Sequence, residues 1–309
     1  MAATQFAMVG LGRMGGNMVR RLARAGMTAA VFDRTPGARA DLARDSGATD
    51  CESLPALIAA TRSPRVVWLM LPAGAATTET FSTLLPQLEP GDVIVDGANA
   101  WYRDSIERGG LAAARAVGFV DAGVSGGIWG LENGYGLMVG GTTEHVAAVG
   151  PYLRALAPKP DLGWLRCGPV GAGHYTKMVH NGIEYGMMQA YAEGLALLDA
   201  KRELELEPAA IAESWRHGTV IRSWLLDLTA EFLARDANLA QLAPVVADSG
   251  EGRWTAVEAI ELGVPAPVIT LALMQRFSSQ GRGDYGNRVL AQMRQAFGGH
   301  AVKSVSDKP

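Results

Sequence analysis

Three glycines directly after a short apolar run constrain the fold of this chain more than any other feature of its sequence. The run FAMVG (6–10) predicts a buried strand, and it leads through Gly10-Leu-Gly12-Arg-Met-Gly15 into a helical pattern, MGGNMVRRLARAG. In such a turn the first glycine permits a tight bend, the second lets a pyrophosphate approach the backbone, and the third lets the helix pack on the strand. The pattern predicts a dinucleotide site, and a glycine-rich turn without a ligand is the alternative.

The second predicted strand, AAVFD (29–33), ends in a residue that bears on the choice of dinucleotide. Asp33 lies where a carboxylate would bind a ribose 2′-hydroxyl. Because a carboxylate repels a 2′-phosphate, we predict NAD as the cofactor. Arg34 follows directly and could partly compensate for that repulsion, which leaves NADP as the alternative. The cofactor contacts predicted from the turn and the strand ends are Gly10, Leu11, Gly12, Arg13, Met14, Gly15, Asp33, Arg34 and Leu71.

Strand patterns and helical patterns alternate along the first half of the chain. Further candidate strands are VVWLML (66–71), DVIVDG (92–97), GFVDAG (118–123) and YGLMVGG (135–141), and GARADLARDSG (37–47) is a helical pattern. This alternation predicts an α/β domain of the Rossmann type, with a doubly wound, mainly parallel sheet covered by helices on both faces. Ligands of such sheets bind at the carboxyl ends of the strands.

The second half of the chain changes character from about Gly171. Strand patterns give way to helical segments rich in Ala, Leu and Met, which we predict at 172–202, 208–217, 220–233, 238–247, 254–262, 266–280 and 284–297. We therefore predict two domains: an NAD(P)-binding Rossmann-type domain at 1–166, and an all-α domain for substrate binding and oligomerisation at 167–309.

One predicted helix carries an unusual set of polar residues. Its sequence HYTKMVHNGIEY (174–185) contains Lys177, His180, Asn181, Glu184 and Tyr185. At about 100° per residue these side chains share less than half of the helix circumference. A solvated helix face is one interpretation, although such a face seldom carries His, Asn and Tyr. The other interpretation is a cleft, in which Lys177 acts as a base and Glu184 as an acid.

Composition and charge exclude several classes of partner. The net charge of −3 gives no reason to expect nucleic acid or an acidic membrane surface as a partner. No apolar run approaches the roughly 20 residues that cross a bilayer, and the strand at 6–10 begins too early for a signal peptide to precede it, so we expect a cytoplasmic protein. The two cysteines and five histidines show no metal-ligand spacing, and we predict no metal.

Several blocks of the sequence resemble one enzyme family. GAGHYTKMVHNGIEYGMMQ (171–189) resembles the catalytic helix of 6-phosphogluconate dehydrogenases, within the β-hydroxyacid dehydrogenase superfamily. DGANAWYRDS (96–105), DAGVSGGIWG (121–130), GEGRWTAVEAIELGVP (250–265) and RQAFGGH (294–300) resemble further blocks of that family, in the same order along the chain. The combination covers the sequence from end to end and is highly specific.

The resemblance implies a reaction and a set of roles. The reaction is oxidative decarboxylation of 6-phosphogluconate to ribulose 5-phosphate and CO₂ with reduction of NAD. Lys177 matches the general base, and Glu184 matches the acid that protonates the enediol. Oxidation of a small or unphosphorylated β-hydroxy acid without decarboxylation is the alternative, and a non-catalytic NAD-binding protein is a more distant one. The resemblance implies substrate contacts from Asn99, Ser125, Gly126, Gly127, His180, Asn181, Tyr185, Arg276, Arg294 and His300, and Asn99 also matches a cofactor contact.

The sequence also departs from the family pattern. Ile128 and Trp129 stand where two glutamates commonly follow the Gly-Gly pair, and Ser249 and Glu251 replace a lysine and a threonine that help to hold the substrate phosphate. A second helical half is missing, as in the short-chain, often NAD-linked branch. The resemblance implies a homo-oligomer, dimer or tetramer, in which the tail with Arg294 and His300 completes a neighbouring site.

Overall fold

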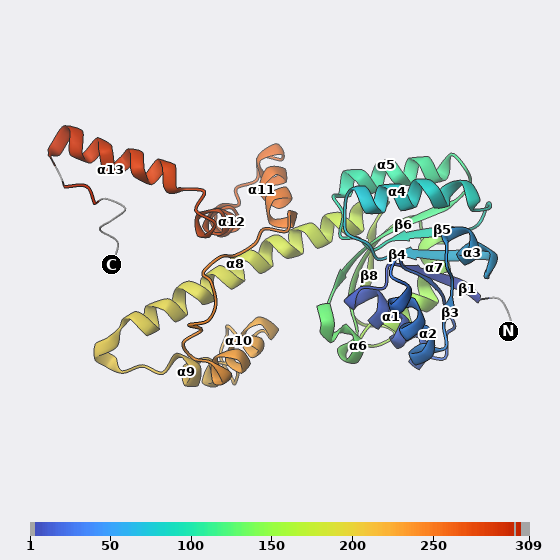
Figure 1. Ribbon diagram of the computed structural model, residues 1–309, viewed down its shortest axis with the longest axis horizontal. Coiled ribbons are helices and arrows are strands. Elements are labelled where there is room, and N and C mark those ends of the chain that lie inside the picture. The colour runs from blue at the N-terminus through green and yellow to red at the C-terminus, as the bar shows by residue number, and fades with distance from the viewer. Residues whose placement is uncertain (1–3, 300, 304–309) are drawn as a thin grey trace. The chain divides into compact units, whose positions relative to one another are not determined.

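The computed structural model describes residues 4–299 and 301–303, and these form two compact units (Figure 1). The first unit is Met1–His180 and the second is Asn181–Pro309. The division falls inside one long helix, α8 (Ala172–Ala200), which contributes residues to both units. The sequence predicts domains at 1–166 and 167–309, so the predicted boundary lies a few residues before α8. These bounds stay a prediction.

The first unit contains an eight-stranded sheet in the order β3-β2-β1-β4-β5-β6-β7-β8. All neighbouring strands are parallel except β6 and β7, which are antiparallel. The α/β fold predicted from the alternating patterns is therefore confirmed. The strands are β1 (Thr4–Val9), β2 (Ala30–Phe32), β3 (Thr49–Asp50), β4 (Thr61–Leu69), β5 (Val93–Asp96), β6 (Gly118–Ser125), β7 (Gly136–Gly140) and β8 (Trp164–Gly168).

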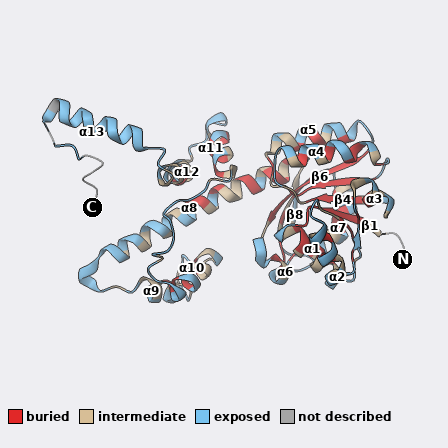
Figure 2. Ribbon diagram, in the orientation of Figure 1, coloured by how far each residue is buried: buried red, intermediate tan, exposed pale blue. Residues whose placement is uncertain are grey.

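Helices cover both faces of this sheet because its central strands are apolar on both sides. In β1, Phe6 and Met8 belong to one core and Ala7 and Val9 to the other. The first core lies under α1 (Arg13–Arg24), α2 (Pro36–Ser46) and α7 (Thr143–Leu156), and the second lies under α3 (Leu54–Ala59), α4 (Ala75–Leu84) and α5 (Tyr102–Ala113). Figure 2 shows the buried strands of this sheet in red.

The second unit consists of helices in the part of it that the structure describes. After α8 come α9 (Pro208–Trp215), α10 (Trp224–Arg235), α11 (Glu251–Glu261), α12 (Pro267–Ser279) and α13 (Asp284–Gly298). The all-α character predicted for the second half is confirmed. Two small cores hold it together, one around Tyr185 and Leu273 and one around Leu226 and Leu233. Many other apolar side chains are exposed, and Figure 2 shows α13 exposed along most of its length.

The helix predicted at 238–247 is wrong, because this segment forms turns and irregular backbone. The Asp236 carboxylate accepts hydrogen bonds from the amides of Asn238 and Leu239, which gives the backbone an alternative to helical bonding. Pro244 has no amide hydrogen and disfavours helical backbone in the residue before it. Apolar spacing alone did not reveal either effect.

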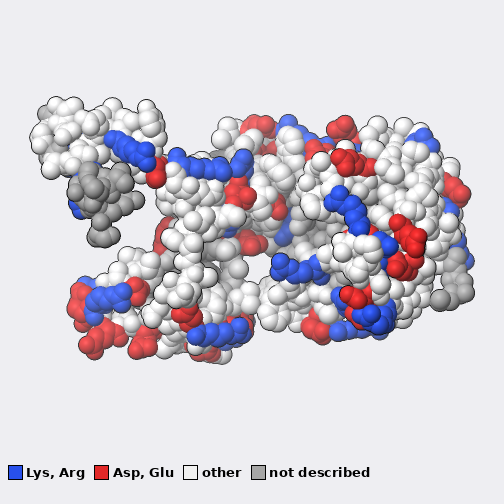
Figure 3. Space-filling view, viewed as in Figure 1, with Lys and Arg blue, Asp and Glu red and all other residues white. Residues whose placement is uncertain are grey.

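The surface charges of the structure are mixed, as the small net charge of −3 leads one to expect. Figure 3 shows acidic and basic side chains interspersed over the face in view. Within residues 4–299 and 301–303, none of the helices has the length and apolar character needed to cross a membrane.

Candidate active site

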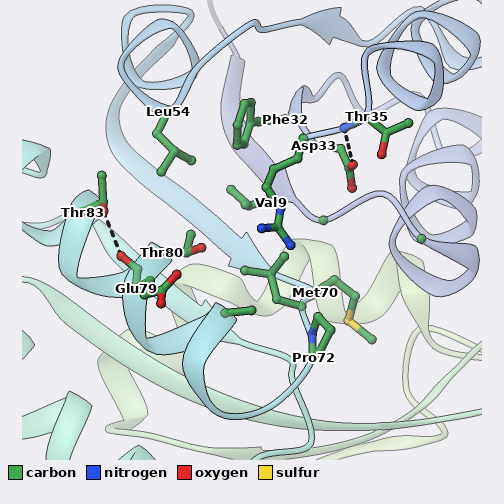
Figure 4. A pocket seen from close by; sticks show the side chains of 15 residues that line it. Val9, Phe32, Asp33, Thr35, Leu54, Met70, Pro72, Glu79, Thr80 and Thr83 are labelled. Carbon is green, nitrogen blue, oxygen red and sulfur yellow. Dashed lines mark hydrogen bonds between the residues drawn. The ribbon is translucent and has the colours of Figure 1, made fainter.

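A cavity of about 480 Å³ opens at the carboxyl ends of β1, β2 and β4. The chain runs from β1 to β2 and β3 on one side and then returns to β4 on the other, so this is the point where the strand order reverses. Dinucleotides bind at such a point in open α/β sheets. Figure 4 shows Asp33 and Thr35 on one side of the cavity and Glu79, Thr80 and Thr83 on the other.

The glycine-rich turn forms the floor of this cavity in the way that a pyrophosphate requires. Gly10 has φ +92°, and a Cβ on Gly15 would lie 2.0 Å from the Gly10 carbonyl oxygen, so both positions need glycine. A Cβ on Gly12 would meet no atom within 4 Å, and Gly12 lines the cavity. The open space in front of Gly12 and the uncapped start of α1 fit a phosphate group.

Asp33 is fixed at the edge of the cavity by two backbone amides. Its carboxylate accepts hydrogen bonds from Leu11 N at 2.8 Å and from Thr35 N at 2.8 Å. Burial alone would raise the pKa of Asp33, but these hydrogen bonds and the charge of Arg34 together hold that pKa below its ordinary value. The carboxylate is therefore charged at neutral pH, as hydrogen bonding to a ribose hydroxyl requires.

The other predicted cofactor residues lie in the same unit at different distances from the cavity. Leu71 and Arg34 line it, as do Gly10 and Gly12. Arg13 and Met14 open α1 outside the lining, and Leu11 is buried. The predictions omitted the α4 residues Glu79, Thr80 and Thr83, because helix packing places them there and no local motif marks them.

A second group of predicted site residues follows β5 and β6. The side chain of Asn99, which has φ 49°, donates to Val124 O at 3.3 Å and accepts from Val124 N at 3.0 Å. This pair of bonds ties the turn after β5 to the end of β6, where Ser125 is the last strand residue. Gly126 and Gly127 then take positive φ values of 123° and 52°.

The polar residues of HYTKMVHNGIEY lie on the single continuous helix α8, so their common face follows from its geometry. Lys177 is buried, and its Nζ lies 3.3 Å from His180 Nδ1. A Cβ on Gly123 would lie 2.3 Å from the Lys177 Cβ, so glycine in β6 is what allows this close packing. One turn earlier, buried His174 shares a 2.7 Å hydrogen bond with Ser105 Oγ.

In the second unit, predicted residues gather around Tyr185. The Arg276 guanidinium stacks on the Tyr185 ring, 3.4 Å from its centroid, and donates to Ala247 O at 2.7 Å. The Tyr185 hydroxyl lies 3.1 Å from Ser249 Oγ and accepts from Ser249 N at 3.3 Å. Asn181 and Glu184 are half-buried on the same helix, α8. The structure thus brings Tyr185, Ser249 and Arg276 together although they are far apart in the sequence.

The remaining predictions concern the tail and metals. Arg294 lies on α13 and is exposed, and His300 lies outside the described residues. Among residues 4–299 and 301–303, no three His, Cys, Asp or Glu side chains are grouped to hold a metal ion.

Two family models match this chain. The NAD binding domain of 6-phosphogluconate dehydrogenase matches residues 5–167, and the 6-phosphogluconate dehydrogenase C-terminal domain matches residues 173–308. The cavity and glycine-rich turn lie within the first match, and α8 from its second residue on, with the Tyr185 group, lies within the second.

Individual relatives agree with the family models. The NAD(+)-dependent, decarboxylating 6-phosphogluconate dehydrogenase of Haloferax volcanii is 40% identical over 305 residues, which cover 98% of this chain and 100% of that protein. The decarboxylating 6-phosphogluconate dehydrogenase of Lactococcus lactis is 37% identical and matches over 62% of its own length. Among solved structures, Plasmodium falciparum 6-phosphogluconate dehydrogenase aligns with a TM-score of 0.83 at 27% identity, covering 99% of this chain and 67% of that one.

Proposed function

The chain belongs to the 6-phosphogluconate dehydrogenase family, and from this premise we propose that it oxidises and decarboxylates 6-phosphogluconate with NAD as the acceptor. The products are ribulose 5-phosphate, CO₂ and NADH. The observation that carries the proposal is the placement of a buried lysine, Lys177, and a glutamate, Glu184, two turns apart on one face of α8. A dehydrogenation needs a base, and the decarboxylation that follows needs an acid.

NAD is the dinucleotide that the cavity suits best. Asp33 presents a negative charge at the edge of the cavity, where a 2′-phosphate would be repelled. Nearby Arg39 is buried and already engaged, since its Nε donates to Asp50 at 2.8 Å and its Nη1 donates to Asp33 O at 2.8 Å. Arg34 is then the cation left to compensate a 2′-phosphate among these neighbours. The name of the Haloferax relative, which specifies NAD(+), supports the same choice.

The bound cofactor supplies a hydride acceptor for C3 of the sugar acid. Lys177, in its neutral form, takes the proton of the 3-hydroxyl while the alcohol at C3 is oxidised to a ketone. Burial suits this role, because a buried amine lacks the water that stabilises its ammonium form. His180, 3.3 Å from the amine, is positioned to exchange a hydrogen bond with it as the charge changes.

Decarboxylation follows because the 3-keto acid can store the electrons of the breaking C1–C2 bond as an enediolate. The protonated Lys177 then stabilises the negative oxygen at C3. Glu184 then protonates the carbon atom from which CO₂ departed, which becomes C1 of ribulose 5-phosphate. Acid–base help of this kind is worth about 10²- to 10⁴-fold in rate for each group.

The substrate phosphate belongs with the second-unit group around Tyr185. The Arg276 guanidinium lies over the Tyr185 ring, with Nη1 donating to Ala247 O and Nη2 to Met188 Sδ, and its remaining N–H groups can bind a phosphate. Ser249 adds a hydroxyl beside the tyrosine. Glu251, an acidic residue, opens α11 beside this group. Ser249 carries no charge, whereas a lysine at that position would be cationic. Both residues make the phosphate group of contacts less positive than the family pattern does.

We further propose that the chain is a homo-oligomer. On α13, Tyr285, Val289, Leu290 and Met293 recur at helical spacing and are 79%, 37%, 60% and 56% exposed. Such an apolar stripe is stabilised by covering it. A second copy of the chain is the partner we propose, with Arg294 and the tail residue His300 completing the neighbouring phosphate site.

A substrate panel tests the function. Purified protein is offered 6-phosphogluconate, gluconate and a small β-hydroxy acid, each with NAD and with NADP, and NADH or NADPH and CO₂ are measured together. We expect the highest kcat/KM for 6-phosphogluconate with NAD, and one CO₂ for each NADH. A tenfold preference for NAD needs about 1.4 kcal/mol, less than the several kcal/mol that juxtaposed like charges can cost. NADH formation without CO₂ from any substrate would contradict the decarboxylating function.

A further inference from the structure

The face of α1 that follows the glycine-rich turn carries three side chains that donate to the backbone of one loop. These side chains are Asn17, Arg21 and Arg24, and the loop is 126–133, between β6 and β7. We propose that they are positioning residues: they hold the 126–133 loop in register with the dinucleotide turn and thereby set the rate of hydride transfer. The proposal rests on the proposed function, in which the glycine-rich turn before α1 binds the dinucleotide and the start of the 126–133 loop contacts the substrate.

Arg21 makes the central contacts. Its Nη1 donates to Leu131 O at 3.1 Å and to Glu132 O at 3.3 Å. Its Nε donates to Ala155 O at 3.1 Å, and its Nη2 donates to Ala157 O at 2.7 Å. One guanidinium thus joins α1 to the 126–133 loop and also to the end of α7. A lysine has a single ammonium group and cannot span all of these carbonyls.

The neighbouring turns of α1 extend the same contact in both directions. Asn17 Nδ2 donates to Ile128 O at 3.4 Å, near the start of the loop. Arg24 forms a two-pronged ion pair with the Glu132 carboxylate, at 3.0 and 2.9 Å, and its Nη1 also donates to Leu131 O at 3.4 Å. Residues 17, 21 and 24 are spaced to share one helix face. One helix therefore binds the loop at Ile128, Leu131 and Glu132.

The loop needs these restraints because its own regular structure is short: a 3₁₀ turn at Gly127–Trp129 and one turn of helix, α6 (Gly130–Asn133). Strand β6 ends at Ser125 and β7 begins at Gly136, so the residues between them have no place in the ladder. Gly126 and Gly127 both have positive φ, and the side chains of Ile128 and Trp129 are 53% and 45% exposed. Apolar side chains that face solvent do not anchor a loop. Close packing begins only at Gly130, where a Cβ would lie 2.0 Å from the Tyr135 ring, and at Gly134, where a Cβ would lie 2.4 Å from Pro158 N.

The two ends of this connection are the two sides of the proposed reaction. Helix α1 begins at the turn that suits the dinucleotide pyrophosphate. The loop follows Ser125 and begins with Gly126 and Gly127, and we propose that these three residues contact the substrate. Reacting atoms must lie about 3–3.5 Å apart, and a displacement of about 1 Å can cost about 100-fold in rate. A direct clamp between the two segments limits that displacement.

The test compares Arg21→Lys, which keeps the charge and loses the multiple contacts, with Arg24→Gln and with Arg44→Gln as the control. Arg44 forms an exposed ion pair with Asp41 on α2 and touches no part of the loop. Amide hydrogen exchange of peptides covering 126–134 is measured on the free protein, and kcat, KM and the NAD dissociation constant on the active enzyme. Thermal unfolding is followed for each variant.

For Arg21→Lys we expect loop amides to exchange about tenfold faster and kcat to fall about tenfold or more, with the NAD dissociation constant within about twofold of the parent. Arg24→Gln should show smaller changes in the same direction, and Arg44→Gln none. A lower unfolding temperature with unchanged loop exchange and unchanged kcat would assign Arg21 a purely structural role and overturn the proposal.

Two further outcomes are distinguishable. If Arg21→Lys does not fold, Arg24→Gln and Asn17→Ala test the proposal instead, because they remove contacts near the surface. Unchanged loop exchange and unchanged kcat in both variants would overturn it. If the parent protein does not oxidise 6-phosphogluconate at all, the proposed function fails. The exchange experiment then still shows whether α1 holds the loop.

Discussion

At the scale of single residues, the proposed chemistry depends on the burial of Lys177. Glycine at position 123 of β6 lets the Lys177 Cβ approach the sheet, and His180 lies within hydrogen-bonding distance of the amine. Burying a charge in such a place costs free energy unless the charge is paired and hydrogen-bonded. The neighbouring apolar residues Met178 and Val179 would fit an ordinary core helix, so Lys177 is the residue that sets this helix apart.

Replacing Lys177 by methionine removes the proposed base and keeps a side chain of similar length. We expect kcat to fall by at least about 10³-fold, within the range that one general acid–base group provides. NAD binding should be unchanged, since Lys177 lines no part of the cavity at β1, β2 and β4. Initial rates of NADH formation and a titration of NAD against intrinsic fluorescence measure the two quantities.

The matched control is Lys201→Met, a lysine beyond the end of α8 whose partner is Glu203. Its kcat should stay within about twofold of the parent, because exposed ion pairs contribute little. Near-normal turnover by the Lys177 variant would remove the assignment of the base.

At the scale of elements, the sequence predicted what local chemistry determines. The glycine-rich turn, Asp33 at the end of β2 and the apolar strands β1, β4, β5 and β6 each carry their signal within about ten residues. The edge strands β3 and β8 are not predicted, because β3 is only two exposed residues and β8, WLRCG, is five residues long with none of them buried. The apolar spacing at 238–247 predicts a helix, whereas the backbone there is irregular.

The site was predictable to the same extent. The polar face of α8 follows from spacing alone, since one helix carries it. The position of Glu79 in the cavity and the stacking of Arg276 on Tyr185 depend on packing between segments far apart in the chain. No periodicity in a single sequence reports such contacts, and only the family resemblance pointed to Arg276.

A buried carboxylate at the start of β4 and β5 makes stability depend on acid. Asp92 accepts from Arg65 N at 2.7 Å, Arg65 Nη1 at 2.9 Å, Ser63 Oγ at 2.9 Å and Glu89 N at 3.0 Å. Burial alone would raise the pKa of Asp92, but these donors outweigh it and hold the pKa below its ordinary value. The ionised form is therefore favoured by folding. Its stabilising contribution is present above the unfolded pKa and is lost as pH falls through the folded pKa.

We expect Asp92→Asn to lower the free energy of unfolding by about 3 kcal/mol at pH 7, the cost of breaking a buried pair. The difference between parent and variant should shrink as the pH is lowered from about 4. Urea unfolding between pH 7 and pH 3 measures this. As a comparison, Asp41→Asn removes an exposed carboxylate and should change stability little at any pH. A difference that is constant with pH would contradict the role given to Asp92.

At the scale of the whole molecule, the exposed apolar stripe of α13 is the feature that most needs explanation. The structure describes α13 as a regular helix whose residues are almost all exposed. Isolated helices of this length are marginal in water, so most helices owe their stability to packing on one face. A second chain can provide that packing, and this is the reason for proposing an oligomer.

Deleting the chain from Arg294 onward should raise KM for 6-phosphogluconate by at least about tenfold, the loss of one charge-assisted phosphate contact worth about 1.5–3 kcal/mol. The NAD dissociation constant should not change, because the cavity lies between residues 9 and 83. Steady-state kinetics and light scattering together measure KM and the oligomeric state.

Two substitutions separate the charge of the tail from its packing. Arg294→Gln should raise KM as the deletion does, whereas Arg288→Gln, an exposed arginine earlier on α13, should not. A deletion variant that keeps the parent KM would show that the tail contributes nothing to substrate binding.

The continuous course of α8 has a consequence for how this enzyme can evolve. Seven residues of α8, about 10 Å along a helix axis, separate the positions of Lys177 and Glu184, the proposed base and acid. Loops and linkers elsewhere can lengthen or shorten without disturbing that interval. A single residue inserted between positions 178 and 183 would instead rotate the carboxyl by about 100°. Insertions and deletions between positions 178 and 183 should therefore be tolerated poorly.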